Sequence, residues 1–386
     1  MVDMVTSTPR YAEFFAGGGM VSAALRGFWT CALANDNDPK KCATYAANWG
    51  ADVLVQGDVR NLSVNALCQP IDLYWASSPC QDFSLAGRGL GLDGIRSGVF
   101  VAWAHLVGKI AALGYSPRMI AFENVAGLVS RNAGRDFESI LLILIRLGYR
   151  VGAIEIDAVD FLPHSRPRIF VVAVRDDIEI PIDVAVLHPS AAQFHTKRLR
   201  GFHSVASQEV RENWVWWKLP KKEPNEKPVG RIIDQTGPHK WFTEYKISHL
   251  LSLMSELHLD KVDQQRQNGR SNVGFVYKRG RPDETGCVRQ FAEVRFDGIA
   301  GCIRTPAGGS SRQTLLFVKG NETRARLMSP REAVRLMGLT DDYILPQSFN
   351  EGYKLAGDGV AVPVVRFLDT HLFRPLLAAS ISRQVA

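Results

Sequence analysis

Short apolar runs alternate with helical patterns across residues 10–175, and this alternation restricts the possible folds more than any other feature of the chain. Strands that alternate with helices predict an α/β fold, in which helices cover both faces of a mostly parallel sheet. The predicted strands are residues 31–34, 53–55, 71–75, 119–122 and 169–174. The predicted helices are residues 39–48, 97–113 and 136–147, the last of which ends at a glycine.

The alternation stops near residue 180 and divides the chain into three segments. A length of 386 residues is enough for two or three domains of ordinary size. We predict a first segment of the main domain at 1–180, a smaller irregular domain at 181–303, and a C-terminal segment at 304–386 that returns to the main domain. Helical patterns recur at 329–337 and 364–377. We expect the tryptophans of the middle segment, Trp214, Trp216 and Trp217, to be core residues.

The excess positive charge lies in one part of the chain. The whole sequence has 46 Lys and Arg against 39 Asp and Glu, a net charge of +7. Residues 191–290 alone have 18 Lys and Arg against 11 Asp and Glu, which is also +7. A basic segment on a neutral body is typical of a surface that binds a polyanion, although a chance bias of a solvated surface gives the same count.

Three observations limit the class of protein. The six cysteines include no C-x-x-C pair, which argues against a disulfide framework and a structural zinc site. The longest apolar run, residues 139–145, is too short to span a membrane. Residues 1–10 lack the apolar core of a secretory signal. We therefore expect a reducing, cytoplasmic setting with no membrane and no metal.

A glycine-rich turn and two carboxylates point to a nucleoside-bearing cofactor. The run Phe14-Phe-Ala-Gly-Gly-Gly-Met20 joins a short strand to a helical stretch, where glycines let a ligand approach the backbone. Asp36 and Asp58 follow the next two strands, where a carboxylate can accept ribose hydroxyls. Each feature alone is more often an ordinary turn or helix cap, but together they favour a binding site.

A cysteine follows the predicted strand at 71–75, in the run Ser77-Ser-Pro-Cys-Gln-Asp-Phe-Ser84. A thiolate at a strand end faces the ligand edge of such a sheet and can act as a nucleophile. The alternative is that Cys80 is a small buried apolar residue, which is the commoner fate of a single cysteine. The glycine-rich residues 87–91 that follow are typical of a loop that closes over a substrate.

Polar residues also follow the predicted strand at 119–122 and precede the one at 169–174. Glu123 follows this first strand, where a carboxyl beside an apolar wall can donate a proton or cap a helix. Arg166 and Arg168 lie two residues apart, so in an extended chain they face the same side. Two guanidinium groups require an anionic or carbonyl partner, either a ligand or a surface salt bridge.

These motifs, in this order, resemble the cytosine-C5 DNA methyltransferase family. The glycine turn, the proline–cysteine run, Glu-Asn-Val at 123–125 and Arg-Pro-Arg-Ile at 166–169 carry the resemblance, and residues 326–338 and 352–363 are similar to its ninth and tenth motifs. The resemblance implies a Rossmann-like sheet that binds S-adenosylmethionine, with a target-recognition domain at 181–303.

The resemblance also implies a role for each matching residue. Cys80 would attack C6 of a flipped-out cytosine, Glu123 would hold N3 and the exocyclic amine, and Arg166 and Arg168 would complete the catalytic set. The implied cofactor residues are Phe15, Gly17, Gly19, Asp36, Asp58, Pro79 and Asp358. The implied DNA contacts are Ser84, Arg88, Arg266, Arg270, Arg304 and Thr305.

The chain departs from the family pattern at a few positions. Met20 replaces a frequent glycine, and Asn37 stands where an aromatic residue often packs on the adenine. His164 replaces the usual Gln before the arginine pair, and Asp358 replaces an Asn, which adds a carboxylate near the cofactor. None of these changes removes a residue to which the resemblance gives a chemical role.

The partner expected from the resemblance is a specific short sequence in double-stranded DNA. We expect a monomer, because one chain contains all the matching motifs. The compact build fits a bacterial cell or phage host, where the protein would associate with the nucleoid. A cognate restriction endonuclease can accompany such an enzyme. An RNA (tRNA) cytosine-C5 methyltransferase is the second hypothesis, although the long basic middle segment argues against it. A catalytically silent DNA-binding relative is the third, although Cys80 and Glu123 are present.

Overall fold

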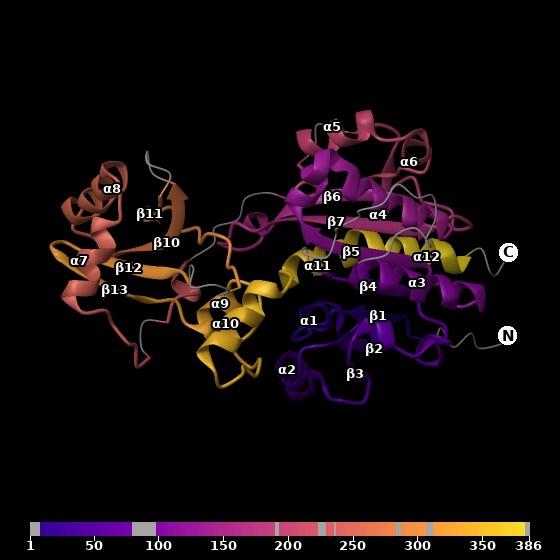
Figure 1. The fold of residues 1–386 in the computed structure, drawn as a ribbon, viewed down its shortest axis with the longest axis horizontal. Helices are drawn as coiled ribbons and strands as arrows, with labels where there is room; N and C mark the ends of the chain where they lie inside the picture. The colour runs from indigo at the N-terminus through magenta and orange to yellow at the C-terminus, as the bar shows by residue number, and fades with distance from the viewer. Residues whose placement is uncertain are drawn as a thin grey trace. The chain divides into compact units, whose positions relative to one another are not determined.

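The computed structural model describes residues 8–78, 98–189, 193–222, 229–234, 237–282, 287–305 and 312–382. The chain forms two compact units (Figure 1). Unit 1 comprises Met1–Asp157, Pro167–Glu223 and Val362–Ala386, and unit 2 comprises Ala158–Arg166 and Pro224–Ala361.

Unit 1 is built on a seven-stranded sheet with strand order β3-β2-β1-β4-β5-β7-β6. Strands β1 to β5 run parallel, and β7 is antiparallel to both β5 and β6. The bounds are β1 Arg10–Phe14, β2 Thr30–Asp36, β3 Leu54–Gln56, β4 Leu73–Ala76, β5 Met119–Val125, β6 Tyr149–Asp157 and β7 Pro167–Arg175. The predicted mostly parallel α/β sheet is confirmed.

Successive residues of each strand point to opposite sides of this sheet, and packed elements bury both faces. On one face, Phe14 packs edge-on against Trp103 of α3, with ring centroids 5.8 Å apart. On the other face, the ring of Trp75 lies 6.2 Å from that of Phe373, which comes from the C-terminal part of the chain. Figure 1 shows α3 and α12 running along the sheet. The C-terminal segment around Phe373 therefore packs on the main sheet.

The helices of unit 1 begin and end where local chemistry favours it. Asp38 caps α2 by accepting from the backbone N–H of Lys40, and Pro39 is the first helical residue. α4 buries one apolar face in the core and is followed by Gly148 at φ +86°. The bounds are α1 Met20–Leu25, α2 Pro39–Trp49, α3 Val99–Ala112, α4 Arg135–Arg146, α5 Lys197–Val205, α6 Gln208–Glu212, α11 Val362–Leu368 and α12 Arg374–Ser382.

Unit 2 contains a four-stranded antiparallel sheet with order β11-β10-β12-β13. α7 and α8 cover one face of it, where Leu250 and Val262 pack with Val276, Val294 and Leu316. The bounds are α7 Glu244–Ser252, α8 Glu256–Gln267, β10 Asn272–Pro282, β11 Val288–Arg295, β12 Thr314–Lys319, β13 Glu322–Leu327, α9 Pro330–Arg335 and α10 Phe349–Asp358.

Unit 2 differs from the irregular middle domain expected from the sequence. Its basic stretch forms a helix and a long strand, and its sheet needs β12 and β13, which follow residue 303. Residues 181–223 pack with unit 1, where they add the short strands β8 Ala185–Val186 and β9 Trp216–Trp217. The compact units therefore have different boundaries from the predicted domains. Trp216 and Trp217 are buried and Trp214 packs on the core, which confirms the expectation for all three.

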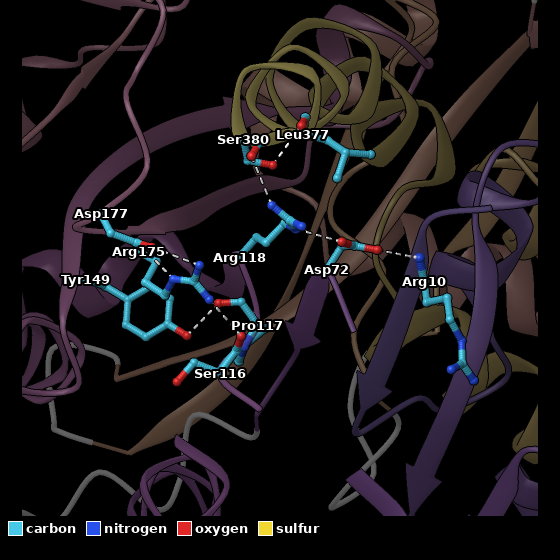
Figure 2. Close-up of polar contacts among 10 residues, drawn as sticks. All are labelled: Arg10, Asp72, Ser116, Pro117, Arg118, Tyr149, Arg175, Asp177, Leu377 and Ser380. Atoms are coloured by element: carbon cyan, nitrogen blue, oxygen red, sulfur yellow. Dashed lines mark hydrogen bonds and ion pairs between the residues drawn. The ribbon is translucent and has the colours of Figure 1, made fainter. Parts of the chain in front are cut away.

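A polar cluster lies at the amino ends of the parallel strands of this sheet (Figure 2). The Asp72 carboxylate accepts from the backbone N–H of Arg10 at 2.9 Å and from Nε of Arg118 at 3.0 Å. Arg118 also donates to the carbonyl of Ser380 near the end of α12. Asp72 therefore links the starts of β1 and β5 and the C-terminal helix.

Replacing Asp72 should destabilise the folded protein. We expect Asp72→Ala to lower the free energy of unfolding by about 1–3 kcal/mol, because the Arg118 guanidinium and the Arg10 amide each lose a charged acceptor. Asp177→Ala is the matched control, since Asp177 is 59% exposed in its ion pair with Arg175 and should cost less than about 1 kcal/mol. Urea unfolding of both variants at pH 7 measures the difference, and equal losses would contradict the interpretation.

Candidate active site

The candidate site residues of unit 1 gather at one edge of its sheet. The glycine turn follows β1, Asp36 ends β2, Ser78 follows β4 and Glu123 lies near the end of β5. β7 runs in the opposite direction, so its first residues lie beside the carboxyl end of β5. Ligands of open α/β sheets bind at this edge, which is where the sequence predicted the site.

The glycine turn is held in a backbone conformation that most residues avoid. Phe15 has φ 58°, which is unfavourable for a residue with a side chain, and Gly17 also has φ 58°. The Gly17 N–H donates to Oδ2 of Asp36 at 2.8 Å. A Cβ placed on Gly17 would meet no atom within 4 Å, so the backbone is open to a ligand here.

Gly19 has a different role from the one predicted for it. A Cβ at Gly19 would lie 2.3 Å from Nε1 of Trp49, and this indole nitrogen donates to the carbonyl of Gly18 at 3.0 Å. The missing side chain therefore admits Trp49, which supports the turn from α2. The sequence analysis did not identify Trp49, because an aromatic residue at the end of a helix is usually a core residue.

The two predicted ribose carboxylates are in different surroundings. Asp36 is buried and accepts from the backbone N–H groups of Gly17 and Asp38, each at 2.8 Å. Asp58 accepts from the backbone N–H of Arg60 and forms an ion pair with its guanidinium. Asp36 is thus fixed against the glycine turn, whereas Asp58 caps the short helical turn that follows β3.

A buried polar network lies behind the glycine turn, and the sequence analysis missed it. Ser22 Oγ donates to Oε2 of Glu13 at 2.8 Å and accepts from the hydroxyl of Tyr11 at 2.9 Å. The hydroxyl of Tyr45 lies 3.0 Å from the same oxygen. Burial raises the pKa of Glu13 to about 8. A polar residue inside an apolar strand was the signal that could have revealed this network.

Glu123 and Arg168 form the charged centre of the site. Nε of Arg168 lies 3.0 Å from Oε1 of Glu123, and their side chains are 13% and 8% exposed. The register pairs Arg168 with Val125, which places the guanidinium beside the Glu123 carboxylate. An ion pair that is this buried offers one carboxylate and one fork of N–H donors to a ligand at the sheet edge.

Asn124 ties the end of β4 to β5. Its Nδ2 donates to the carbonyl of Ser78 at 3.0 Å, and its Oδ1 accepts from the backbone N–H of Val125. Ser78 is the last described residue before the predicted nucleophile, and its buried Oγ has no hydrogen-bond partner among the described residues. Pro79, Cys80, Ser84 and Arg88 lie outside the described residues.

Arg166 and Arg168 bind different groups, although the sequence analysis expected them to act as a pair. The Arg166 guanidinium is buried in unit 2 and donates to the carbonyls of Ile303, Gly357 and Gly359 at 3.0, 2.9 and 2.6 Å. These contacts hold the chain after residue 302 against the end of α10. They favour a structural role for Arg166 over the predicted catalytic one.

His164 supports the same part of unit 2. The imidazole is fully buried, its Nδ1 lies 3.1 Å from the carbonyl of Leu336, and its Nε2 accepts from the backbone N–H of Ile303 at 3.1 Å. A Gln side chain can likewise donate once and accept once, so the departure from the family pattern at this position keeps the same bonding capacity.

Some of the remaining predicted residues of unit 2 bind other side chains, and others are exposed. The Thr305 hydroxyl donates to the Asp358 carboxylate, so a predicted DNA contact and a predicted cofactor contact bind each other. Arg266 pairs with Asp263 and donates to Thr323, which favours a structural role over the predicted DNA contact. Arg304 and Arg270 are exposed and available to a ligand.

The described residues fit the cofactor that the family resemblance implies. The turn at Gly17 leaves open space over the backbone, and the Ser78 hydroxyl is buried without a partner in the described part of the chain. No group of three potential metal ligands occurs among the described residues. None of the described helices is long and apolar enough to cross a membrane.

Comparisons with known proteins identify the family of this chain. The sequence profile of C-5 cytosine-specific DNA methylases matches residues 10–374. Type II methyltransferase M.HpaII of Haemophilus parainfluenzae is 27% identical over 92% of this chain and 87% of its own length. Type II methyltransferase M.Bsp6I of Bacillus sp. (strain RFL6) is 24% identical over 95% of this chain and 99% of its own.

A solved structure shares the fold. A mutant of Spodoptera frugiperda DNMT2 matches with a TM-score of 0.62 and 16% identity, over 95% of this chain and 99% of that one. The profile match spans nearly the whole chain, so the protein belongs to the family of C-5 cytosine-specific DNA methylases. This membership makes it an S-adenosylmethionine-dependent enzyme that methylates C5 of cytosine in DNA.

The buried Glu13 predicts a pH-dependent stability. Its pKa is about 8 in the folded protein and 4.5 in the reference state, so between these values the folded protein holds a proton that the unfolded chain has lost. Stability should therefore fall as pH rises through this window, by about 1 kcal/mol per pH unit from this group. Glu13→Gln should lack this contribution. Urea unfolding of both proteins at pH 5 to 8 measures it, and a constant difference between them would contradict the assignment.

Proposed function

We propose that this protein methylates C5 of a flipped-out cytosine within one short sequence of double-stranded DNA, through a covalent bond between Cys80 and C6. The observation that supports it most is the buried Glu123–Arg168 pair beside the end of β4. The strand end that leads to Cys80 is anchored to β5 by Asn124, the neighbour of Glu123. The carboxylate and the guanidinium therefore come from adjacent strands, and β4, the strand that precedes Cys80 in the sequence, pairs with β5.

In this proposal the side chains divide the reaction into easier steps. The Cys80 thiolate adds to C6, and the electron pair of the C5–C6 double bond moves toward C5, which makes C5 nucleophilic. Glu123 donates a proton to N3 and accepts from the exocyclic amine, and Arg168 donates to the carbonyl oxygen, so the charge that develops on the ring is stabilised. Once C5 carries the transferred methyl group, loss of the C5 proton expels the Cys80 thiolate and restores the aromatic ring.

S-adenosylmethionine supplies the methyl group in this reaction. Phe15, Gly17 and Asp36 would hold it at the carboxyl ends of β1 and β2, with Asp58 near the adenine. The open backbone at Gly17 supports this placement. We do not include Gly19 in the contact set, because its missing side chain accommodates Trp49.

Methyl transfer from labelled S-adenosylmethionine to unmethylated genomic DNA, with total tRNA in parallel, tests the proposal. Label on DNA, with bisulfite sequencing placing it at cytosine C5 in one short motif, supports it and supplies the target sequence. Label on tRNA alone would favour the RNA methyltransferase hypothesis. Intact cofactor binding without transfer would favour a silent DNA-binding relative.

Removing the nucleophile should abolish transfer. We expect Cys80→Ala to leave no measurable methylation while S-adenosylmethionine affinity stays within about twofold, because only the covalent step requires the thiolate. Cys68→Ala is the matched control, since the Cys68 thiol lies after the short helical turn Val64–Leu67 and donates to a backbone carbonyl there. Substantial methylation by Cys80→Ala would overturn the covalent mechanism.

Neutralising the site carboxylate should slow the reaction without unfolding the protein. We expect Glu123→Gln to reduce transfer by about 100-fold or more, because an amide can form a hydrogen bond to N3 but cannot give it a proton. Glu155→Gln is the control, because it removes another nearly buried carboxylate of unit 1, the ion-pair partner of Arg198. Initial rates at saturating cofactor compare the two variants, and equal rates would remove Glu123 from the mechanism.

A further inference from the structure

The long hairpin of unit 2 extends past its own sheet. β12 pairs with β10 only over Asn272–Val276, whereas β11 pairs with β10 as far as Pro282. Residues 277–282 of β10 and 288–293 of β11 therefore form a two-stranded antiparallel ribbon with no third strand among the described residues. We call these residues the distal ribbon. Its connecting turn, residues 283–286, lies outside the described residues.

The distal ribbon contributes little to the core of unit 2. The apolar cluster under α7 and α8 includes Val276, Ala292 and Val294, at the base of the hairpin. Toward the tip, Arg279, Arg289 and Gln290 are exposed, and Val288 is 75% exposed. Core packing therefore does not explain why the chain extends the ribbon this far.

The charge of the two strands is strongly positive. Residues 272–282 and 287–295 contain five Lys or Arg and one Glu, a net charge of +4. The register places Arg281 opposite Arg289 and Gly280 opposite Gln290. Positive residues on an exposed strand can simply prevent edge-to-edge aggregation, which is the alternative explanation.

Arg279 is held in a defined orientation, which edge protection does not require. Its guanidinium carbon lies 4.6 Å from the centroid of the Tyr277 ring, its Nε lies 3.5 Å from Oε2 of Glu293, and it donates to the Tyr277 hydroxyl. The side chain is nonetheless 42% exposed. A guanidinium has five N–H donors, so its tip retains donors for a further acceptor. Part of the entropy cost of ordering this long side chain is therefore met before binding.

The two-stranded form of the ribbon suits one groove of duplex DNA. The major groove of B-DNA admits a two-stranded β-ribbon, and a guanidinium can donate to O6 and N7 of guanine there. An exposed Gln opposite a glycine leaves room for contact with a base edge or a phosphate. The net positive charge complements the phosphates on both sides of the groove.

We infer that the distal ribbon enters the major groove of the substrate duplex and that Arg279 reads a guanine of the target sequence. This inference rests on the proposed function, because it names the residue that selects the methylated sequence. The neighbouring positive residues grip phosphates and contribute affinity without sequence information.

The test compares full-length variants on a DNA library in which each position of the target motif is varied. Arg279→Ala and Arg279→Lys both remove the planar fork, but Arg279→Lys keeps the charge. Both should lose roughly 5- to 150-fold of discrimination at one guanine position, and Arg279→Lys should keep most of its DNA affinity. Arg200→Ala, which removes an exposed arginine of α5, controls for the loss of one positive charge.

Replacing that guanine by 7-deazaguanine removes the N7 acceptor from the major groove. Wild-type protein should then lose discrimination, and Arg279→Ala should lose little more, because both changes remove the same contact. Unchanged discrimination in Arg279→Ala, or an equal decline on all sequences, would overturn the inference. If wild-type protein methylates no DNA, the proposed function itself fails, which is a separate result.

Discussion

The pairing of β5 with β4 on one side and with β7 on the other creates the site. Parallel pairing with β4 brings Ser78, and the chain that leads to Cys80, to the same sheet edge as Glu123. Antiparallel pairing with β7 brings the first residues of a distant strand to that edge and places Arg168 against Glu123. A sheet that was parallel throughout would carry the start of this strand to the opposite edge.

Buried side chains beneath the glycine turn support the part of the site proposed to hold the cofactor. Trp49 fills the space left by Gly19, and Glu13, Ser22 and Tyr45 form a buried polar network under the same turn. A buried carboxyl is costly unless it is protonated or well bonded, and the Ser22 hydroxyl supplies such a bond to Glu13. The strained backbone at the turn requires such support, because an unsupported turn would relax.

The two compact units have different chemistry. Unit 1 contains the sheet edge with Glu123 and Arg168, and unit 2 contains an antiparallel sheet whose long hairpin is positively charged and exposed. Arg166 and His164 bind backbone groups of unit 2: Arg166 donates to the carbonyl of Ile303, and His164 accepts from the N–H of the same residue. Two residues that precede β7 in the sequence thus serve a different unit from Arg168, although only one residue separates Arg166 from Arg168.

Local patterns in the sequence were enough to predict the α/β class, the edge of the sheet where the site lies and most strands of unit 1, because strand alternation and strand-end polarity can be recognised within short windows. Three features could not be predicted in this way: Gly19 admits Trp49, Arg166 binds carbonyls of unit 2, and β12 and β13 complete the sheet of unit 2. These features depend on contacts between residues far apart in the chain. A residue type limits what a side chain can bind, but the packed chain selects which partner it meets.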